Sequence, residues 1–331
     1  MSQPEKIKIA LIGAGGWGHQ HARIFSQRRD VDFCAVVGRT LERTTARAQE
    51  FGVRAYTDIA EMLQREKPDL VSLCLPNQGH YAPTLQVIQA GVPLLVEKPL
   101  VFDPAEAQTL VEEAAKRDLF FAINFNWRYA RPVQMAYEAI DAGRLGEIVF
   151  AAWRFGGEGD SDHPHANLIE TQCHGLDMLE HLCGPIASIM AEMTDKTGRG
   201  YRSLVLSLRF ASGAVGSLVG TYDSSYAYPD THRLEINGTD ARIVIDDTVR
   251  RFSFQRTGSE TAEVWQAGFF NDRDREFHRT FDSHIEAILT AFHAGQPPPI
   301  HARAGKRAVD LAFAAIESFE TGQRIPVPHK I

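Results

Sequence analysis

The sequence predicts an α/β protein in which a doubly wound parallel sheet over residues 1–125 precedes an α+β domain over residues 126–331 with a mostly antiparallel, open sheet. Three observations lead to this prediction. Up to about residue 125, short apolar runs alternate with longer amphipathic stretches, as in β-α units. Beyond that point, strand-like runs follow one another without intervening helices, which is typical of an antiparallel sheet. A glycine-rich turn also closes the first apolar run.

The first region alternates strands and helices along its whole length. Apolar runs predict strands over 7–12, 31–37, 70–75, 93–96 and 120–124, and helical spacing predicts helices over 19–28, 40–51, 57–66, 81–90 and 104–117. Gly52 ends the second helix, Thr57 or Asp58 caps the third, and Asp103 caps the last.

The second region has a different order of elements. Helices are predicted over 132–142, 167–182, 277–294 and 303–322, and strands over 148–155, 186–193, 203–210, 214–222, 231–237 and 241–246. In open α/β sheets, ligands bind at the carboxyl ends of the parallel strands. Three tight motifs follow such ends in the first region, at 13–18, 76–77 and 97–99, so we expect the site there.

Composition excludes several classes of function. The net charge of −7 argues against nucleic acid as a partner, because phosphate binding requires a basic face. No apolar run approaches the roughly 20 residues of a membrane span, and the polar start of the chain lacks a secretory signal. The four cysteines form no C-x-x-C pair, so we expect reduced thiols in a cytoplasmic protein.

The glycine-rich turn predicts binding of a dinucleotide. Gly13 permits the tight turn, Gly15 leaves room for a pyrophosphate, and Gly18 lets the helix pack on the strand. The helix N-terminus offers backbone N–H groups to the phosphates. The alternative, a purely structural turn, is disfavoured by the position between a strand and a helix. The predicted cofactor contacts here are Gly13, Ala14, Gly15, Gly16, Trp17 and Gly18.

The end of the second strand predicts a preference for NADP over NAD. About 20 residues after Gly18, an NAD-specific domain carries an acidic residue for the ribose hydroxyls, and this chain has Gly38. Arg39 follows and can pair with a 2′-phosphate, Thr40 supplies a hydroxyl, and Arg43 lies one turn further on. Arg39 as a solvated loop residue and Thr40 as a simple helix cap are the alternatives.

Two further groups of residues carry potential acid–base chemistry. Lys98 ends an apolar strand, where a lysine could donate a hydrogen bond to a substrate hydroxyl or could simply lie on the surface. Glu170, His174 and Asp177 share one side of a predicted helix. A carboxylate and an imidazole on one face can act as base and orienting group, although a solvated helix face with a core histidine has the same pattern.

The motifs together resemble those of the Gfo/Idh/MocA oxidoreductase family, which includes glucose–fructose oxidoreductase and inositol dehydrogenase. The resemblance covers nearly the whole chain, and its most diagnostic part is Glu97-Lys98-Pro99. The other matching motifs are the glycine turn, Pro76-Asn77-x-x-His80, Asn124-Phe125-Asn126-Trp127-Arg128-Tyr129, the run 143–148, and 170–177.

The resemblance implies roles for particular residues. Lys98 and His174 serve catalysis, Glu170 replaces the aspartate of the family, and the Lys98–Pro99 peptide is cis. Additional cofactor contacts are expected at Leu75, Pro76, Asn77, His80, Glu97, Lys98 and Asn126. Substrate contacts are expected at Lys98, Arg154, His163, Glu170, His174 and Asp177. The resemblance also implies a homodimer or homotetramer formed through the open sheet face.

The leading hypothesis is an NAD(P)-dependent dehydrogenase or reductase that transfers a hydride between nicotinamide and a sugar, polyol or sugar-derived carbonyl. The alternatives are a cofactor-sensing protein without turnover and a nucleotide-sugar enzyme that retains its cofactor. A cofactor-sensing protein without turnover would not need to retain Lys98 and His174 together, and this chain has both. A metal site is not expected, because the candidate ligands match no zinc spacing; they are Asp160, Asp162, His163, His165, His174 and His181.

Overall fold

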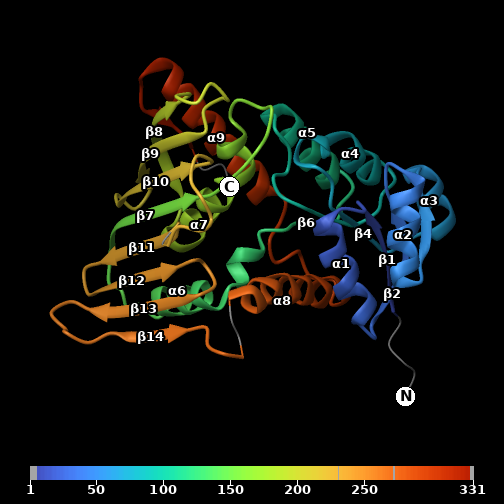
Figure 1. The fold of residues 1–331 in the computed structure, drawn as a ribbon, viewed down its shortest axis with the longest axis horizontal. Coiled ribbons are helices and arrows are strands. Elements are labelled where there is room, and N and C mark those ends of the chain that lie inside the picture. The colour runs from blue at the N-terminus through green and yellow to red at the C-terminus, as the bar shows by residue number, and fades with distance from the viewer. Residues whose placement is uncertain (1–5, 230, 271–272, 329–331) are drawn as a thin grey trace. The chain divides into compact units, whose positions relative to one another are not determined.

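The computed structural model describes residues 6–229, 231–270 and 273–328 (Figure 1). It contains two compact units. The first comprises residues 1–125 and 281–306, and the second comprises residues 126–280 and 307–331. The chain therefore enters the second unit directly after Phe125, returns to the first at Phe281, and leaves it again after Lys306.

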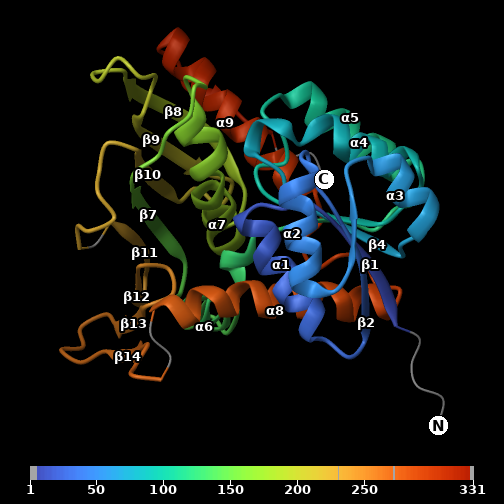
Figure 2. The same cartoon turned by 45° about the vertical axis from the view of Figure 1, so that its right-hand side comes forward.

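The first unit is built on a parallel six-stranded sheet with the strand order β3-β2-β1-β4-β5-β6. Figure 2 labels β1, β2 and β4 of this sheet. Its strands are β1 (Ile7–Ile12), β2 (Val31–Val37), β3 (Arg54–Tyr56), β4 (Leu70–Leu73), β5 (Leu94–Val96) and β6 (Phe121–Ile123). Its connecting helices are α1 (Gly16–Gln27), α2 (Leu41–Phe51), α3 (Ile59–Glu66), η1 (Asn77–Gly79), α4 (Tyr81–Gln89) and α5 (Pro104–Ala115). The order reverses between β1 and β4, which is the position where dinucleotides bind in such sheets.

Local signals in the sequence explain the limits of these helices. The carboxylate of Asp58 accepts a hydrogen bond from the backbone of Glu61, so Asp58 rather than Thr57 caps α3. Asp103 caps α5 in the same way, and Gly52 ends α2 in a left-handed conformation at φ 68°. The predicted doubly wound parallel sheet is confirmed, with β3 as a short strand that the sequence analysis missed.

Residues 281–306 pack with the first unit, whereas the sequence analysis assigned them to the second domain. They include much of α8 (Arg273–His293) and the start of α9 (Arg303–Thr321). The connection between these helices runs along β6, where the backbone N–H of Ile123 donates to the carbonyl of Ile300. The N–H of Ala302 donates to the carbonyl of Phe121. These backbone bonds satisfy groups at the edge of the sheet and account for the difference.

The second unit is built on a nine-stranded sheet with the order β14-β13-β12-β11-β7-β10-β9-β8-β15 (Figure 1). Only β10 and β7 are parallel among the described pairs, so the predicted mostly antiparallel sheet is confirmed. The strands are β7 (Ile148–Gly156), β8 (Ile186–Thr194), β9 (Ser203–Phe210), β10 (Val215–Thr221), β11 (His232–Gly238), β12 (Ala241–Asp246), β13 (Arg251–Arg256), β14 (Glu263–Gln266) and β15 (Ile325–Pro326). The helical elements are η2 (Asn126–Tyr129), α6 (Arg131–Asp141), the π-helical turn η3 (Asn167–Thr171) and α7 (Cys173–Cys183).

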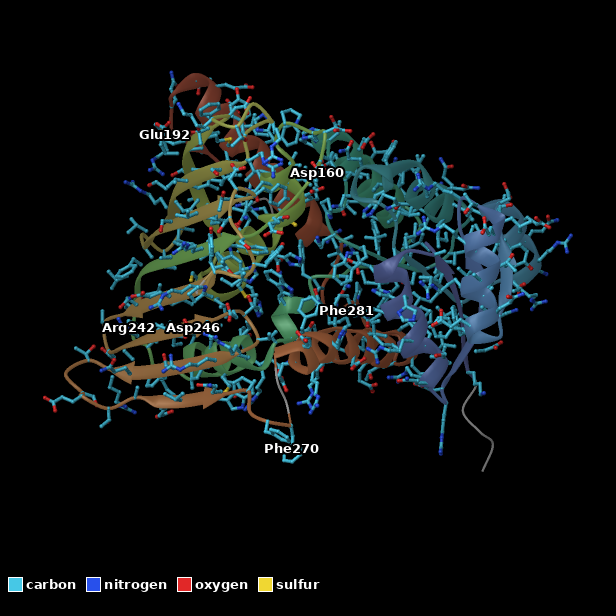
Figure 3. All side chains as sticks on the ribbon, in the orientation of Figure 1. Asp160, Glu192, Arg242, Asp246, Phe270 and Phe281 are labelled. Carbon is cyan, nitrogen blue, oxygen red and sulfur yellow. The ribbon has the colours of Figure 1, made fainter. Side chains whose placement is uncertain are left out.

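The two faces of this sheet differ in character. On β7, Trp153 and Phe155 are buried on the face that α7 covers, whereas Arg154 and Phe150 point to the other face and are exposed. Figure 3 labels Glu192 and Arg242, which lie on that other face on β8 and β12. An exposed apolar group continues there on β9 and β10, with Val205 and Val215 about half exposed, so one sheet face is open.

Candidate active site

The glycine turn after β1 has the geometry that a dinucleotide requires. Gly13 has a φ of +125°, and a Cβ there would lie 2.1 Å from the carbonyl oxygen of Cys74. A Cβ on Gly18 would lie 2.0 Å from the carbonyl oxygen of Gly13. Both positions therefore exclude any side chain. Gly15 and Gly16 have no atom within 4 Å of a hypothetical Cβ, so their backbone borders open space.

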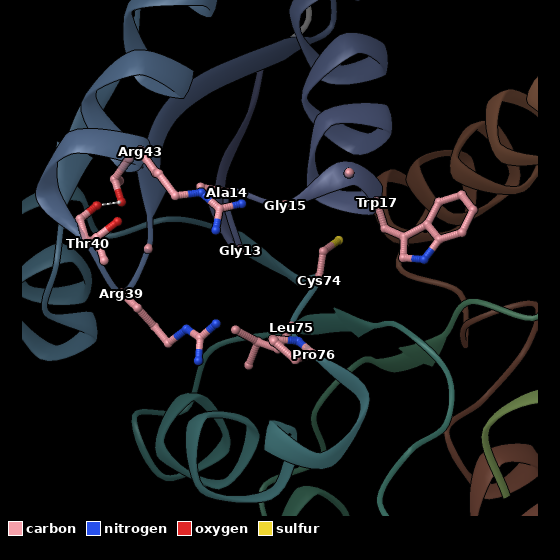
Figure 4. A pocket seen from close by; sticks show the side chains of 13 residues that line it. Gly13, Ala14, Gly15, Trp17, Arg39, Thr40, Arg43, Cys74, Leu75 and Pro76 are labelled. Atoms are coloured by element: carbon pink, nitrogen blue, oxygen red, sulfur yellow. Dashed lines mark hydrogen bonds between the residues drawn. The ribbon is translucent and has the colours of Figure 1, made fainter. Parts of the chain in front are cut away.

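This open space is a cavity of about 480 Å³ at the end of the parallel strands (Figure 4). Helix α1 begins there without a side-chain cap and without an acidic residue in its first turn. Its backbone N–H groups and partial positive charge suit a pyrophosphate. The cavity is lined by Gly13, Ala14, Gly15, Gly16, Trp17, Gly38, Arg39, Thr40, Arg43, Thr44, Cys74, Leu75 and Pro76. The geometry fits a dinucleotide cofactor.

Two arginines border this cavity from α2 and the loop before it (Figure 4). Among the described residues, neither Arg39 nor Arg43 forms an ion pair, although Arg47 on the same helix pairs with Glu50. Thr40 is the N-cap residue of α2, and its side chain makes no capping hydrogen bond. The cavity therefore has two exposed cations at the position where the ribose edge of a dinucleotide would lie.

The structure gives Gly38 a second explanation. A Cβ at this position would lie 2.3 Å from Oγ1 of Thr44 and 3.2 Å from Cβ of Ala14. Glycine at this position therefore also suits the close packing against Thr44 on α2 and Ala14 in the glycine turn, whatever the cofactor. The case for a 2′-phosphate then depends on Arg39 and Arg43 rather than on the missing side chain of Gly38.

The segment 97–99 that follows β5, called the Lys98 loop below, is held by a buried carboxylate. Glu97 is 4% exposed, and its Oε1 atom accepts a hydrogen bond of 2.6 Å from the amide of Asn124. The same oxygen lies 3.1 Å from Nε2 of His21, while Oε2 accepts a bond of 3.2 Å from the backbone N–H of Lys98. His21 reaches Oγ of Ser72 through Nδ1 at 2.8 Å. The Lys98–Pro99 peptide is cis, as predicted.

The electrostatics of Glu97 favour its ionised form. Burial alone would raise its pKa, but the hydrogen bond and charge of His21, together with Asn124 and Lys98, outweigh burial and lower the pKa. A negative charge is therefore fixed in the protein interior next to the half-buried Lys98. His21 and Asn124 both contact Glu97, and the sequence had suggested no site role for either, although Asn124 lies in one of the matching motifs.

His80 supports the same loop rather than bordering the cavity. Its ring is 3% exposed, with Nδ1 2.7 Å from the carbonyl oxygen of Pro99 and Nε2 3.0 Å from that of Leu75. Burial lowers the pKa of His80 despite these two backbone contacts. The ring links the segment after β4 to the segment after β5 through these two carbonyl contacts, so the role of His80 is to stabilise the Lys98 loop. Asn77 lies in the short helix η1 between these segments.

In the second unit, Glu170 lies in the π-helical turn η3, a type of distortion often found at functional sites. It is 9% exposed, and its Oε1 atom accepts a hydrogen bond of 2.8 Å from the hydroxyl of Tyr222. That hydroxyl also lies 2.5 Å from Oγ1 of Thr171. Burial, followed by the charge of Glu170, raises the pKa of Tyr222, so Tyr222 remains a donor. The longer side chain of glutamate is thus held at a defined position.

His174 is the second residue of α7 and is 6% exposed. Its ring is stacked on the indole of Trp127, with the centroids 4.0 Å apart and an angle of 11° between the planes. Asp177, three residues later, is bonded through both carboxylate oxygens to Arg128, at 2.9 and 2.5 Å. Asp177 was expected to contact the substrate, but its carboxylate instead holds η2 on α7.

The remaining predicted residues lie in different places. Arg154 is on the open sheet face, on the opposite side from Trp153 and α7, so we do not retain it as a substrate residue. The amide of Asn126 donates to Oγ1 of Thr280 at 2.7 Å, and Asn126 is 3% exposed. His163 lies in the loop before η3, where burial lowers its pKa.

Within the part of the chain that the structure describes, one group of three potential metal ligands lies close together: His21, Cys74 and Glu97. This group is not the histidine-rich set noted in the sequence. Its His21 and Glu97 are bonded to one another, and burial raises the pKa of Cys74, which keeps the thiol protonated. Hydrogen bonding explains the group without a metal ion.

Comparison with known proteins agrees with this geometry. A profile described as an oxidoreductase family with an NAD-binding Rossmann fold (GFO_IDH_MocA) matches residues 7–125. A profile of the GFO/IDH/MocA C-terminal domain matches residues 133–244. The chain belongs to the Gfo/Idh/MocA oxidoreductase family. The resemblance noted in the motifs is thereby confirmed over more than half of the chain.

Similar characterised proteins are dehydrogenases. Myo-inositol 2-dehydrogenase of Thermotoga maritima is 25% identical, with 98% of this chain and 100% of that protein covered. D-glucoside 3-dehydrogenase of Escherichia coli K12 is 35% identical over 144 residues, which span 43% of this chain and 41% of that protein. The second match thus covers less than half of either protein.

Solved structures share the fold. Levoglucosan dehydrogenase in complex with NADH and levoglucosan has a TM-score of 0.87 at 18% identity, covering 98% of this chain and 100% of that one. An oxidoreductase from Agrobacterium radiobacter in complex with NAD⁺, L-tartaric acid and magnesium has a TM-score of 0.86 at 19% identity, covering 97% of this chain and 98% of that one.

In the part of the present chain that the structure describes, no helix is long and apolar enough to cross a membrane.

Proposed function

We propose that this family member catalyses hydride transfer between a nicotinamide cofactor and a carbinol carbon of a sugar, polyol or related carbonyl compound. The observation that carries the proposal is the buried support of Lys98 in the same unit as the dinucleotide cavity, in a chain whose second unit holds His174 and Glu170 in buried positions. The names of similar proteins, which include inositol and glucoside dehydrogenases, support a carbohydrate-like substrate.

The proposed roles follow from the chemistry of each side chain. The cofactor, when bound, accepts or supplies the hydride at the nicotinamide ring. His174 takes the proton of the substrate hydroxyl during oxidation and returns it during reduction. Lys98 donates a hydrogen bond to the same oxygen and stabilises its developing negative charge. Glu170, held by Tyr222, accepts a hydrogen bond from a neighbouring hydroxyl.

Single substitutions test these roles. Lys98→Ala and His174→Ala are each expected to lower kcat by a factor on the order of 10² or more and to leave cofactor binding intact. Lys116→Ala at the C-cap of α5 and His278→Ala on α8, both exposed, serve as matched controls. Full activity in both site variants would contradict the assignment. The substrate class is tested by screening sugars and polyols for production of reduced cofactor, and cofactor binding without turnover of any of them would favour a sensing protein.

We also propose a preference for NADP. Arg39 and Arg43 border the cavity without carboxylate partners among the described residues, and each can form a charge-assisted bond to a 2′-phosphate. The double variant Arg39→Ala, Arg43→Ala is expected to lower kcat/KM with NADP about tenfold or more and to affect NAD much less. Arg47→Ala, on the same helix but paired with Glu50, is the control. A wild-type protein that prefers NAD tenfold would overturn the proposal.

We further propose that two copies of the chain associate through the open sheet face. Supporting this, Phe150, Val205 and Val219 are 39, 49 and 37% exposed on that face. Val219→Asp should convert the dimer or tetramer to monomer in light-scattering measurements. Leu41→Asp, at an equally apolar exposed position on α2, should not. A wild-type protein that is monomeric at all concentrations would rule the association out.

A further inference from the structure

The stack of Trp127 on His174 carries an inference beyond the roles given above. The two rings are nearly parallel and stacked face to face, with centroids 4.0 Å apart and an angle of 11° between the ring planes. Both side chains are buried, at 8 and 6% exposure. We propose that Trp127 is a positioning residue that fixes the plane of the His174 imidazole and stabilises the imidazolium formed when His174 accepts the substrate proton. This inference rests on the proposed role of His174 as the base.

The ion pair between Arg128 and Asp177 fixes the stack from one side. Arg128 directly follows Trp127, and Asp177 lies three residues after His174, which places the two on the same side of α7. The guanidinium contacts both oxygens of the Asp177 carboxylate, which is the most directional ion-pair geometry available to these side chains. The bidentate ion pair therefore connects η2 to α7 close to both rings, because Arg128 is next to Trp127 and Asp177 is one helical turn from His174.

Aromatic neighbours fix the indole from the other directions. The ring of Trp127 lies 6.1 Å from that of Trp153 and 5.5 Å from that of Phe155. Trp153 is itself held by a hydrogen bond of 3.2 Å from Nε1 to Oε1 of Gln172. Gly175, next to His174, leaves the space that the Trp153 side chain occupies, because a Cβ at this position would lie 2.4 Å from Nε1 of Trp153. The stack is therefore part of a close-packed cluster.

The stack also has an electrostatic consequence. The face of an indole carries negative potential and attracts a cation, so it favours a protonated imidazole over a neutral one. Among the described residues of this unit, the charged or titratable groups near the stack include Arg128 and Asp177, which are paired with each other, Glu170, which is hydrogen-bonded to Tyr222, and His232, whose ring lies 5.1 Å from that of Trp127. Trp127 is a neutral group in direct face-to-face contact with the base.

Variants at Trp127 separate these effects from simple packing. In Trp127→Leu, the protonated form of His174 loses its π partner, so the acidic limb of the pH profile of kcat/KM should move to lower pH by about 0.5 to 1 unit. The plateau of kcat should fall about tenfold because the imidazole is less well oriented. Trp127→Phe keeps an aromatic face and should restore both values most of the way.

Trp153→Leu is the matched control, because it removes an indole from the same cluster but not the one stacked on His174. It should lower stability in urea about as much as Trp127→Leu does and leave the acidic limb in place. An NMR titration of His174 in Trp127→Leu, read without turnover, should show the same downward shift. An unmoved His174 titration, or a Trp127→Phe variant as impaired as Trp127→Leu, would overturn the inference. Retained activity in His174→Ala would instead refute the proposed function.

Discussion

The Nε2 atom of His21 lies 3.1 Å from the Oε1 atom of Glu97, and the two side chains are 0 and 4% exposed. This contact joins the first helix of the dinucleotide-binding unit to the residue that precedes the proposed catalytic lysine. It lies at the centre of a polar network inside an otherwise apolar core, because Ser72 and Asn124 bind its two ends. His284, on α8, extends the network to Asn124 at 2.6 Å.

Removing one partner of this pair should be costly. His21→Leu leaves the Glu97 carboxylate buried with one donor fewer, and we expect the free energy of unfolding to fall by about 3 kcal/mol. The control Phe25→Leu, at a buried position on the same helix, should cost only about 1 kcal/mol. Urea denaturation measures both. The double variant His21→Leu, Glu97→Gln should recover part of the loss, because it removes the buried charge. Equal losses of stability in His21→Leu and Phe25→Leu would contradict this account.

The hydroxyl of Tyr222 should matter for turnover. Tyr222→Phe removes the donor that holds Oε1 of Glu170, and we expect kcat/KM to fall about tenfold, which corresponds to about 1.4 kcal/mol. Cofactor affinity should not change. Tyr201→Phe, a hydroxyl deletion in the same unit at a ring stacked on His165, is the control. Equal kinetics in the wild type and Tyr222→Phe would show that the Tyr222 hydroxyl is not needed to place Glu170.

Most of the fold could be predicted because its signals are local. The strands predicted at 7–12 and 31–37 have the same bounds as β1 and β2, because in each case a run that is apolar except for Lys8 or Asp32 ends at a glycine. The strand β3 was missed because it has only three residues and one buried side chain. The strand β13 was missed although Phe252 and Phe254 alternate with polar residues, a signal that was present in the sequence.

The site was predictable only where a motif is contiguous in sequence. The Glu97-Lys98-Pro99 motif could be located, but its supports could not, because His21 and Asn124 are 76 and 27 residues away from Glu97. Arg154 was misplaced for another reason: alternation along β7 sends it to the face opposite Trp153, and only the packing of α7 shows which face is covered. The π-helical turn at 167–171 likewise has no signal in the helical spacing that predicted one continuous helix.

The ion pair between Arg128 and Asp177 should be strongly coupled. Its side chains are 21 and 4% exposed, and the contact is bidentate. A double-mutant cycle with Arg128→Ala and Asp177→Ala should give a coupling free energy of about 2 kcal/mol. The nearby pair Arg131–Glu138, at 45 and 64% exposure, should give less than about 0.5 kcal/mol. Similar coupling in the two cycles would remove the basis for treating η2 as fixed on α7.

The stability of the second unit should depend on the protonation of His181. Burial, and then the charge of Arg128, lowers the pKa of His181 to about 4, and its ring is stacked on Tyr137 with centroids 5.1 Å apart. An unfolded histidine has a pKa of about 6.5, so between pH 6.5 and 4 the unfolded chain binds more protons than the folded one. Stability from this residue is therefore fully present above pH 6.5 and is lost as the pH falls toward 4, by up to about 3 kcal/mol.

His181→Phe keeps a ring for the stack on Tyr137 and removes the titrating group. Other buried histidines, such as His80 and His165, also have lowered pKa values and add a slope of the same sign, so the comparison must be between variants. Urea denaturation at pH 7 and pH 5 should show a smaller loss of stability in His181→Phe than in the wild type. The exposed His278→Phe variant should lose as much as the wild type. If His181→Phe loses as much stability as the wild type does, His181 is not held neutral by the fold.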